Sequence, residues 1–255
     1  MSDEITPKGA GALWRDLRSL TGARIGLARS GASIATGPSL DFKLAHARAR
    51  DAVHEELDSD KLRADLVPLG LPVLVVDSAV GARRDYLMRP DLGRKLSSEA
   101  QSALAPFAGR YDVAVVIADG LSARAVQTHA TPLLPALLPV LQEQGLSFAP
   151  LVIVRNGRVA IGDAIAEILG ASSVAILIGE RPGLSAPDSM GAYLTWQPGP
   201  ATTDADRNCI SNIRPEGIGT ADAALKIAQL LSAMRARGVS GVRLKDEPGR
   251  LPEGG

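Results

Sequence analysis

Residues 113–122 have the sequence VAVVIADGLS, which gives the strongest indication of the fold. Its first six residues are continuously apolar, which is typical of a strand buried on both faces of a parallel sheet. The run stops at Asp119 and Gly120, and a helical pattern follows Ser122. We therefore predict a buried strand, a polar turn and then a helix, which together form one unit of an α/β sheet.

The same order of elements continues along the chain. Apolar runs predict strands at residues 151–154, 173–178 and 192–196, and helical spacing predicts helices at residues 133–144, 162–169 and 221–237. Strands that alternate with helices indicate the α/β class, with a Rossmann-like, doubly wound, mostly parallel sheet. We place this domain at residues 109–255.

A smaller helical part is expected to precede the sheet, at residues 13–108. Helices are predicted at residues 13–20, 39–57 and 97–107, with a short strand at residues 72–77 and a glycine-rich loop at residues 24–38. Residues 1–12 are expected to be disordered. The loop does not have the G-x-x-x-x-G-K-[ST] pattern of a phosphate-binding loop.

The composition excludes several classes of protein. Lys and Arg number 28 and Asp and Glu number 28, so the formal net charge is zero and a nucleic-acid partner is not expected. No apolar run approaches the roughly 20 residues of a membrane-spanning helix. The single cysteine and the polar N-terminus predict a reduced, cytoplasmic protein without a signal peptide.

Polar groups stand where three of the predicted strands end, at residues 119–122, 154–159 and 180–183. Parallel sheets bind ligands at this edge, so we expect these groups to converge on one site. A G-x-G-x-x-G motif is missing, and Asp119 would repel a pyrophosphate, which disfavours a dinucleotide.

Two residues near this edge have more than one interpretation. Glu180 could cap the following turn, pair with Arg181 or accept a hydrogen bond from a ligand. Cys209 could be a small buried apolar residue or a nucleophile, but a nucleophile would need a base nearby. Asp206 and Arg207 can be interpreted as a local ion pair.

Two histidines and an arginine-rich segment are more typical of contacts with a partner than of a catalytic or metal site. His46 and His54 are eight residues apart on one predicted helix, which is two turns, whereas a two-histidine metal site uses one turn. We expect surface or partner-facing histidines and no metal site. The arginine-rich residues 83–94 are interpreted either as a solvated loop or as a contact with a partner or an anion.

Several segments together resemble one family, the small (light) subunit of ethanolamine ammonia-lyase. They occur in the family's order and span nearly the whole chain: LTGARIGL (20–27), YLMRPDLGR (86–94), IADGLS (117–122), VRNGRV (154–159), GERPGL (179–184), ATT (201–203) and DRNCISNI (206–213).

The resemblance implies an adenosylcobalamin-dependent lyase that converts ethanolamine to acetaldehyde and ammonia. The small subunit is expected to share the cobalamin site with a large catalytic subunit and to be active only in that complex. By resemblance, Val159, Glu180 and Cys209 occupy cofactor-contact positions, and residues 83–94 are our prediction for part of the subunit interface. No catalytic residue is assigned to this chain, and the cobalt is expected to take no ligand from it.

The resemblance also bears on location. Some members of the family carry a long N-terminal extension linked to packing into a bacterial microcompartment, whereas only about a dozen residues precede Leu13 here. We expect a cytoplasmic complex, with a microcompartment as the other possibility. Two other functions stay open at this point: an independent Rossmann-like enzyme acting on a small nucleotide through Asp119, Glu180 or Cys209, and a scaffold that does not contact a ligand.

Overall fold

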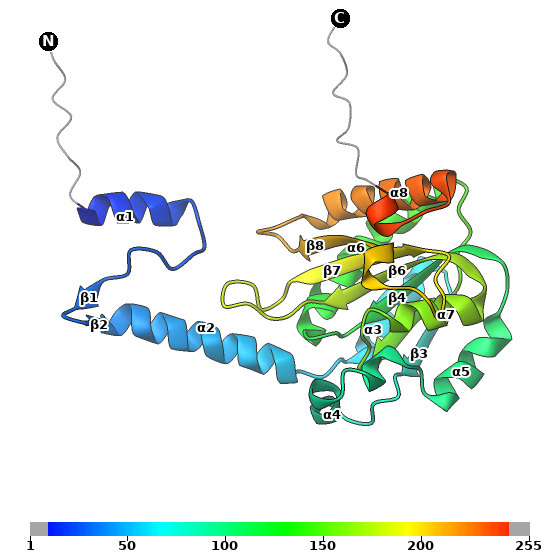
Figure 1. Ribbon diagram of the computed structural model, residues 1–255, viewed down its shortest axis with the longest axis horizontal. Coiled ribbons are helices and arrows are strands. Elements are labelled where there is room, and N and C mark those ends of the chain that lie inside the picture. The colour runs from blue at the N-terminus through cyan, green and yellow to red at the C-terminus, as the bar shows by residue number, and fades with distance from the viewer. Residues whose placement is uncertain (1–9, 245–255) are drawn as a thin grey trace, which may run out of the picture.

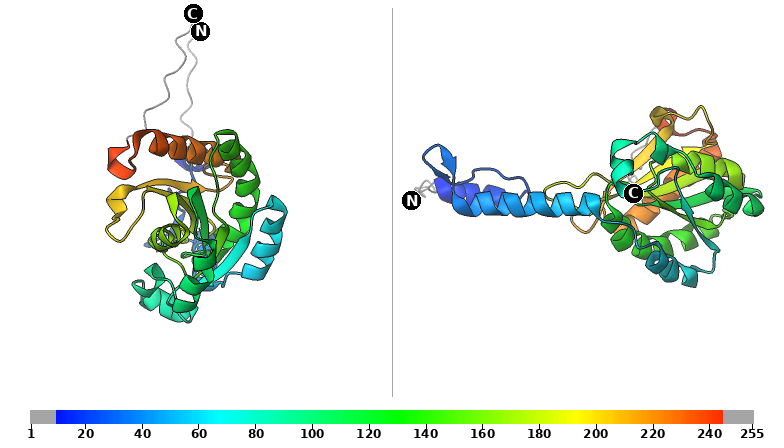
Figure 2. Two further views of the ribbon diagram at one scale, coloured as in Figure 1. Left: turned by 90° about the vertical axis from the view of Figure 1, so that its right-hand side faces the viewer. Right: turned by 90° about the horizontal axis from the view of Figure 1, so that it is seen from below.

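The computed structural model of the chain describes residues 10–244. Figure 1 shows a body built around one sheet and, projecting from it, a segment at residues 10–54 that we call the arm. The right view of Figure 2 shows the arm outside the layers of the body. Disorder was predicted for residues 1–12. Residues 1–9 lie outside the described residues, whereas residues 10–12 belong to helix α1 (Ala10–Ser19), so the prediction was wrong for them.

A six-stranded sheet forms the centre of the body, in the order β3-β5-β4-β6-β7-β8. The four strands from β3 to β6 are parallel, and β7 and β8 continue the sheet in antiparallel pairing. This arrangement confirms the predicted α/β class with a mostly parallel sheet. The strands are β3 (Val73–Asp77), β4 (Tyr111–Ala118), β5 (Leu151–Arg155), β6 (Ala171–Gly179), β7 (Met190–Trp196) and β8 (Arg207–Ile213).

Helices cover both faces of the sheet because the buried strands are apolar on both faces. In β4, Val113, Val115 and Ile117 pack with α3 (Ser59–Leu66), α6 (Ala123–Glu143) and α8 (Thr220–Arg237). The alternate residues Ala114, Val116 and Ala118 pack with α5 (Ser98–Leu104) and α7 (Ile161–Leu169). Successive side chains of a strand point to opposite faces, so one apolar run supplies two cores.

Several elements differ from those predicted, three of them in the helices and strands around the sheet. Helix α6 runs without interruption through Pro132, Pro135 and Pro139, although a separate helix was predicted from residue 133. Its leucines are buried in the core, and this packing outweighs the hydrogen bonds that the prolines cannot donate. Strand β8 was not predicted because its sequence is mostly polar, and helix α3 was not predicted either.

The arm consists of α1 (Ala10–Ser19), a two-stranded hairpin of β1 (Arg29–Ser30) and β2 (Ser33–Ile34), and α2 (Thr36–His54). Both predicted helices are present with shifted ends, and the predicted loop contains the hairpin. Among residues 10–244, no helix combines the length and the apolar character needed to cross a membrane.

Candidate functional site

Strands β4 and β6 end against each other at the edge where a ligand was expected. The backbones of Gly120 and Gly179 touch there: a Cβ on Gly179 would lie 2.0 Å from the carbonyl oxygen of Ser122, and a Cβ on Gly120 would lie 2.3 Å from the carbonyl oxygen of Gly179. Only glycine fits at such a distance, because any side chain would overlap the neighbouring backbone. This contact places the turn after β4 beside residue 180.

A cavity of about 260 Å³ opens beside this glycine contact. Val159 and Glu180, two of the three predicted cofactor contacts, both belong to its wall. Cys209 is not among the lining residues. The wall consists of Tyr86, Gly120, Leu121, Arg158, Val159, Ile178, Gly179, Glu180, Arg181 and Tyr193.

The carboxylate of Glu180 is held by groups from two other segments of the chain. It accepts hydrogen bonds from the hydroxyls of Ser189 and Ser211, each at 2.5 Å, and from the backbone N–H of Asn212 at 3.2 Å. These partners lie before β7 and at the end of β8, so Glu180 is not held by Arg181 or by a turn cap. A carboxylate has about four acceptor sites, so one remains for a ligand donor.

Cys209 lies beside Tyr193, which is its partner in the register of β7 and β8. The two side chains form a hydrogen bond, and burial raises the pKa of both groups above their ordinary values. The residue as a whole is nevertheless exposed, so the interpretation of Cys209 as a buried apolar residue was wrong. His129 packs on the opposite face of the sheet, 3.7 Å from Asp188, and so does not act as a base for this thiol.

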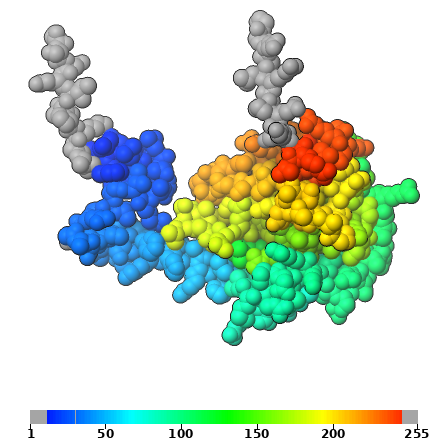
Figure 3. Space-filling model, viewed as in Figure 1, coloured from blue at the N-terminus to red at the C-terminus, as the bar shows by residue number. Residues whose placement is uncertain are grey.

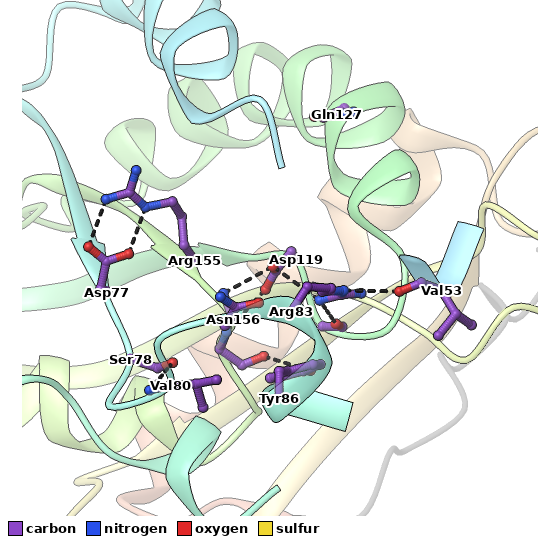
Figure 4. Close-up of polar contacts among 12 residues, drawn as sticks. Val53, Asp77, Ser78, Val80, Arg83, Tyr86, Asp119, Gln127, Arg155 and Asn156 are labelled. Atoms are coloured by element: carbon purple, nitrogen blue, oxygen red, sulfur yellow. Dashed lines mark hydrogen bonds and ion pairs between the residues drawn. The ribbon is translucent and has the colours of Figure 1, made fainter. Parts of the chain in front are cut away.

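Val159 follows a turn that is fixed by Asp119, whose carboxylate bonds to Asn156 in Figure 4. The Asp119 carboxylate accepts hydrogen bonds from the backbone N–H groups of Asn156 and Gly157, both at 3.0 Å. Asn156 has φ of 56°, an unusual backbone conformation that these bonds stabilise. Asp119 therefore serves as an anchor for the turn.

The cation that accompanies Asp119 is Arg83, which is 6% exposed. Its Nη1 lies 3.2 Å from Asp119 Oδ2 and 2.9 Å from the carbonyl oxygen of Gly120, and its Nε donates to the carbonyl oxygen of Val53. Burial raises the pKa of Asp119 to about 6, although Arg83 and the backbone N–H groups oppose this shift.

Residues 83–94 are therefore not one solvated loop, as one interpretation of the sequence had it. Residues Arg83–Met88 form helix α4, in which Arg83 and Tyr86 are buried. The Tyr86 hydroxyl donates to the carbonyl oxygen of Gly157 at 3.2 Å, and the guanidinium of Arg158 lies 4.2 Å from the centre of the Tyr86 ring. Arg89 and Asp91 form an exposed ion pair beyond the helix.

A second cavity of about 620 Å³ continues from the first, with which it shares Leu121, Arg158 and Arg181. Helix α2 supplies His46, Arg50 and His54 to its wall. The histidines thus face a basic groove, and residues 10–244 contain no cluster of three His, Cys, Asp or Glu suited to a metal ion.

A cavity of about 760 Å³ lies on the other side of Asp119, at the carboxyl ends of β3 and β5. Its wall includes Asp77 and Arg155, which form an exposed ion pair at 2.6 Å, as Figure 4 shows. The predicted cofactor contacts are not among its lining residues. Tyr86, Arg158 and Tyr193 were not predicted from the sequence as site residues. Tyr86 and Arg158 lie in the segments 86–94 and 154–159 that resemble the family, and Tyr193 lies within a predicted strand.

Comparisons with known proteins agree over nearly the whole chain. Residues 12–245 match the family model described as Ethanolamine ammonia-lyase light chain (EutC). The ethanolamine ammonia-lyase small subunit of Bradyrhizobium diazoefficiens is 53% identical over 249 residues, covering 97% of this chain and 94% of that protein. The protein of the same name from Azotobacter vinelandii is 52% identical over 238 residues, covering 92% of this chain and 88% of that protein.

Proposed function

The chain belongs to the ethanolamine ammonia-lyase light-chain family, and from this premise we propose that it is the small subunit of an adenosylcobalamin-dependent ethanolamine ammonia-lyase. In this proposal it forms one wall of the cobalamin site, at the interface with a catalytic large subunit, and takes part in ethanolamine degradation. The observation that carries the proposal is the cavity that brings Val159 and Glu180 together, with Tyr193 linking it to Cys209.

The side chains around this cavity fit a corrinoid, which has apolar faces and a rim of amides. Glu180 has an acceptor site left for an amide N–H, and Val159 and Ile178 offer apolar contact. The Nε of Arg158 is buried and has no hydrogen-bond partner among the described residues, so it is a donor available to a ligand oxygen. This combination of one acceptor, one free donor and an apolar surface supports binding of a corrinoid.

Adenosylcobalamin, when bound, supplies the radical that the carbon–nitrogen cleavage requires. The residues of this chain bind the cofactor and hold it in one orientation. Glu180 fixes the position of an amide, while Val159 and the Tyr193–Cys209 pair form the wall. We assign no catalytic residue here, and we propose that the chain is active only with the large subunit, in the cytoplasm or in a microcompartment.

We also propose that the sheet is Rossmann-like and doubly wound. Support comes from the helices on both faces and from β4, which lies between β5 and β6 and so creates a switch point beside the cavity. The alternative of an independent nucleotide enzyme has weaker support, because Asp119 is bonded to Arg83 and to the backbone, and Glu180 is bonded to Ser189 and Ser211.

Reconstitution tests the proposed function directly. The purified chain should not deaminate ethanolamine, and activity should require the chain, the large subunit and adenosylcobalamin together. Full activity of the large subunit with cofactor alone would overturn the proposal.

Glu180→Ala should weaken adenosylcobalamin binding to the assembled complex by about 1–2 kcal/mol, or about 5-fold to 30-fold in Kd, since one hydrogen bond to a charged group is lost. An absorbance titration of the complex with the cofactor measures this. Glu167→Ala is the matched control, because Glu167 is an exposed carboxylate on α7. Equal affinity of the Glu180 variant and the wild type would indicate a scaffold without ligand contact.

Alkylation of Cys209 can report whether the cofactor covers this position, because the chain has one cysteine and is therefore labelled at a single site. Burial raises its pKa, so alkylation by iodoacetamide should be slow at pH 7.5 and should accelerate with rising pH as the thiolate forms. Adding adenosylcobalamin to the complex should slow alkylation by about tenfold or more if the cofactor covers the thiol. Mass spectrometry of the complex with and without cofactor measures the rate, and equal rates would remove Cys209 from the proposed contacts.

A further inference from the structure

Residues 181–189 connect β6 to β7 and directly follow Glu180; we call them the β6–β7 segment. In Figure 3 this segment, drawn in yellow-green, extends from the body to the side of the arm, where Arg24 donates to the carbonyl oxygen of Leu184. Arg181 and Leu184 line the basic groove, and Arg181 also lines the cavity that contains Glu180. The position of this segment therefore affects the shape of the proposed cofactor site.

The end of the β6–β7 segment holds Glu180 in place. The backbone N–H of Glu180 donates to the carbonyl oxygen of Ser189 at 2.9 Å, and the Ser189 hydroxyl donates to the Glu180 carboxylate at 2.5 Å. Ser189 is 6% exposed, and on its far side Met190 begins β7, where it pairs with Gly179. The direction of the Glu180 side chain thus depends on Met190 and on the two residues that precede Ser189.

Helix α6 contacts both of those residues. The hydroxyl of Ser122, the N-cap of α6, donates to the carbonyl oxygen of Pro187 at 2.9 Å. About two turns further along the same helix, Nε2 of His129 lies 3.7 Å from Oδ2 of Asp188. The leucines of α6 are buried in the core, so the helix is a rigid support for the segment.

The His129 ring is buried with one nitrogen that forms no hydrogen bond. His129 is 4% exposed, and its Nε2 has no hydrogen-bond partner among the described residues. Such a buried atom is unfavourable unless a partner is close. In the described part of the chain, Asp188 is the carboxylate within ion-pair range of this ring, and a shift of about 0.5 Å would bring it into hydrogen-bond range. A neutral imidazole with its hydrogen on Nε2 can donate this bond, so the ring need not gain a proton.

We propose that His129 is a positioning residue for the cofactor site: its Nε2–H holds Asp188 and, through Ser189, the carboxylate of Glu180. This inference rests on the proposed function, in which Glu180 contacts the cofactor. It adds a residue that lines neither the cavity with Glu180 nor the basic groove and acts from the opposite face of the sheet.

The test compares His129→Leu, Asp188→Ala and the double variant in the complex with the large subunit. An absorbance titration with adenosylcobalamin measures Kd. Each single substitution should weaken binding about 5-fold, the factor that corresponds to one hydrogen bond. The double variant should bind no more weakly than His129→Leu alone, because both substitutions break the same contact.

Two variants on α6 distinguish the N–H group from the packing of the ring. His129→Gln should bind within about twofold of the wild type, because the glutamine amide is also an N–H donor. Thr131→Val is the matched control. The Thr131 hydroxyl oxygen is also buried without a hydrogen-bond partner among residues 10–244, so it does not bond to the β6–β7 segment, and its removal should leave Kd unchanged.

Hydrogen exchange of the full-length chain gives a second measurement that does not depend on the cofactor. The Glu180 amide should exchange about 5-fold faster in His129→Leu and in Asp188→Ala, because its bond to Ser189 opens more often. In Asp188→Ala the amides of β4 should keep the wild-type rate, since the Asp188 side chain is 32% exposed and its loss leaves the core intact.

The outcomes separate this inference from the proposed function. Wild-type affinity of His129→Leu and Asp188→Ala, or losses that add in the double variant, would overturn the role of His129. A loss in His129→Gln as large as in His129→Leu would assign the effect to packing of the ring and also overturn it. If His129→Leu does not fold, Asp188→Ala and His129→Gln decide by the same criteria. Wild-type affinity of Glu180→Ala would instead overturn the cofactor contact, while exchange of the Glu180 amide would still show whether His129 positions it.

Discussion

Asp119→Ala is expected to lower the free energy of unfolding by about 3–5 kcal/mol, the cost of leaving one member of a buried ion pair without its partner. The substitution removes the counter-charge of Arg83, whose side chain is 6% exposed. It also removes the acceptor of the N–H groups of Asn156 and Gly157. Both effects act in the interior, where water does not replace the lost partner.

Chemical denaturation at pH 7.5 measures this difference. At that pH the carboxyl is ionised even though burial raises its pKa to about 6, so the pair with Arg83 is formed. Asp77→Ala is the matched control, because Asp77 pairs with Arg155 at the same edge of the sheet but both side chains are about half exposed. This exposed pair should contribute at most about 1 kcal/mol, and equal losses in the two variants would contradict the assignment of Asp119 as an anchor.

Asp119→Ala should also affect the residues that line the proposed cofactor cavity. Asp119 holds the turn that leads to Arg158 and Val159, and Tyr86 bonds to the same turn from α4. With the anchor removed, the turn loses its fixed position, and cofactor affinity of the complex should fall although Asp119 does not line that cavity. A variant that still folds and binds the cofactor normally would show that the other bonds of the turn, from the Tyr86 hydroxyl to Gly157 and from the Arg158 N–H to the carbonyl oxygen of Gly93, are enough to hold it.

Gly179→Ala is expected to destabilise the protein by about 3 kcal/mol or more, at the upper end of the costs of overpacking. The added Cβ would lie 2.0 Å from the carbonyl oxygen of Ser122 and 2.5 Å from that of Asp119. Both atoms belong to the backbone, so the strand ends must separate to make room. Their separation would displace Glu180, which follows directly.

Gly183→Ala is the control for Gly179→Ala. A Cβ at this position would have its nearest neighbour at 3.7 Å, which is ordinary van der Waals contact. Thermal unfolding should leave this variant close to the wild type while Gly179→Ala unfolds several degrees lower. Similar melting temperatures for all three proteins would show that β4 and β6 are not in close contact at their ends.

Predictions from the sequence were most successful where one residue type dominated. The run at residues 113–118 is apolar at every position, and a strand with that pattern must be buried on both faces, so a parallel sheet covered by helices followed. Prediction failed for β8, because an edge strand buries few side chains and its polar sequence resembles a loop.

The class of the fold, the family and the edge of the sheet where Glu180 lies could be predicted from the sequence, because these depend on local patterns and on motifs in a fixed order. The contacts between distant side chains could not be predicted in this way. Arg83 reaches Asp119 across 36 residues, and Tyr193 meets Cys209 through the antiparallel register of β7 and β8. Such pairings arise from how the elements pack, and the order of residues along the chain does not encode them locally. The exposure of the arm likewise could not be predicted from the sequence, because it depends on the body forming its core from the other residues.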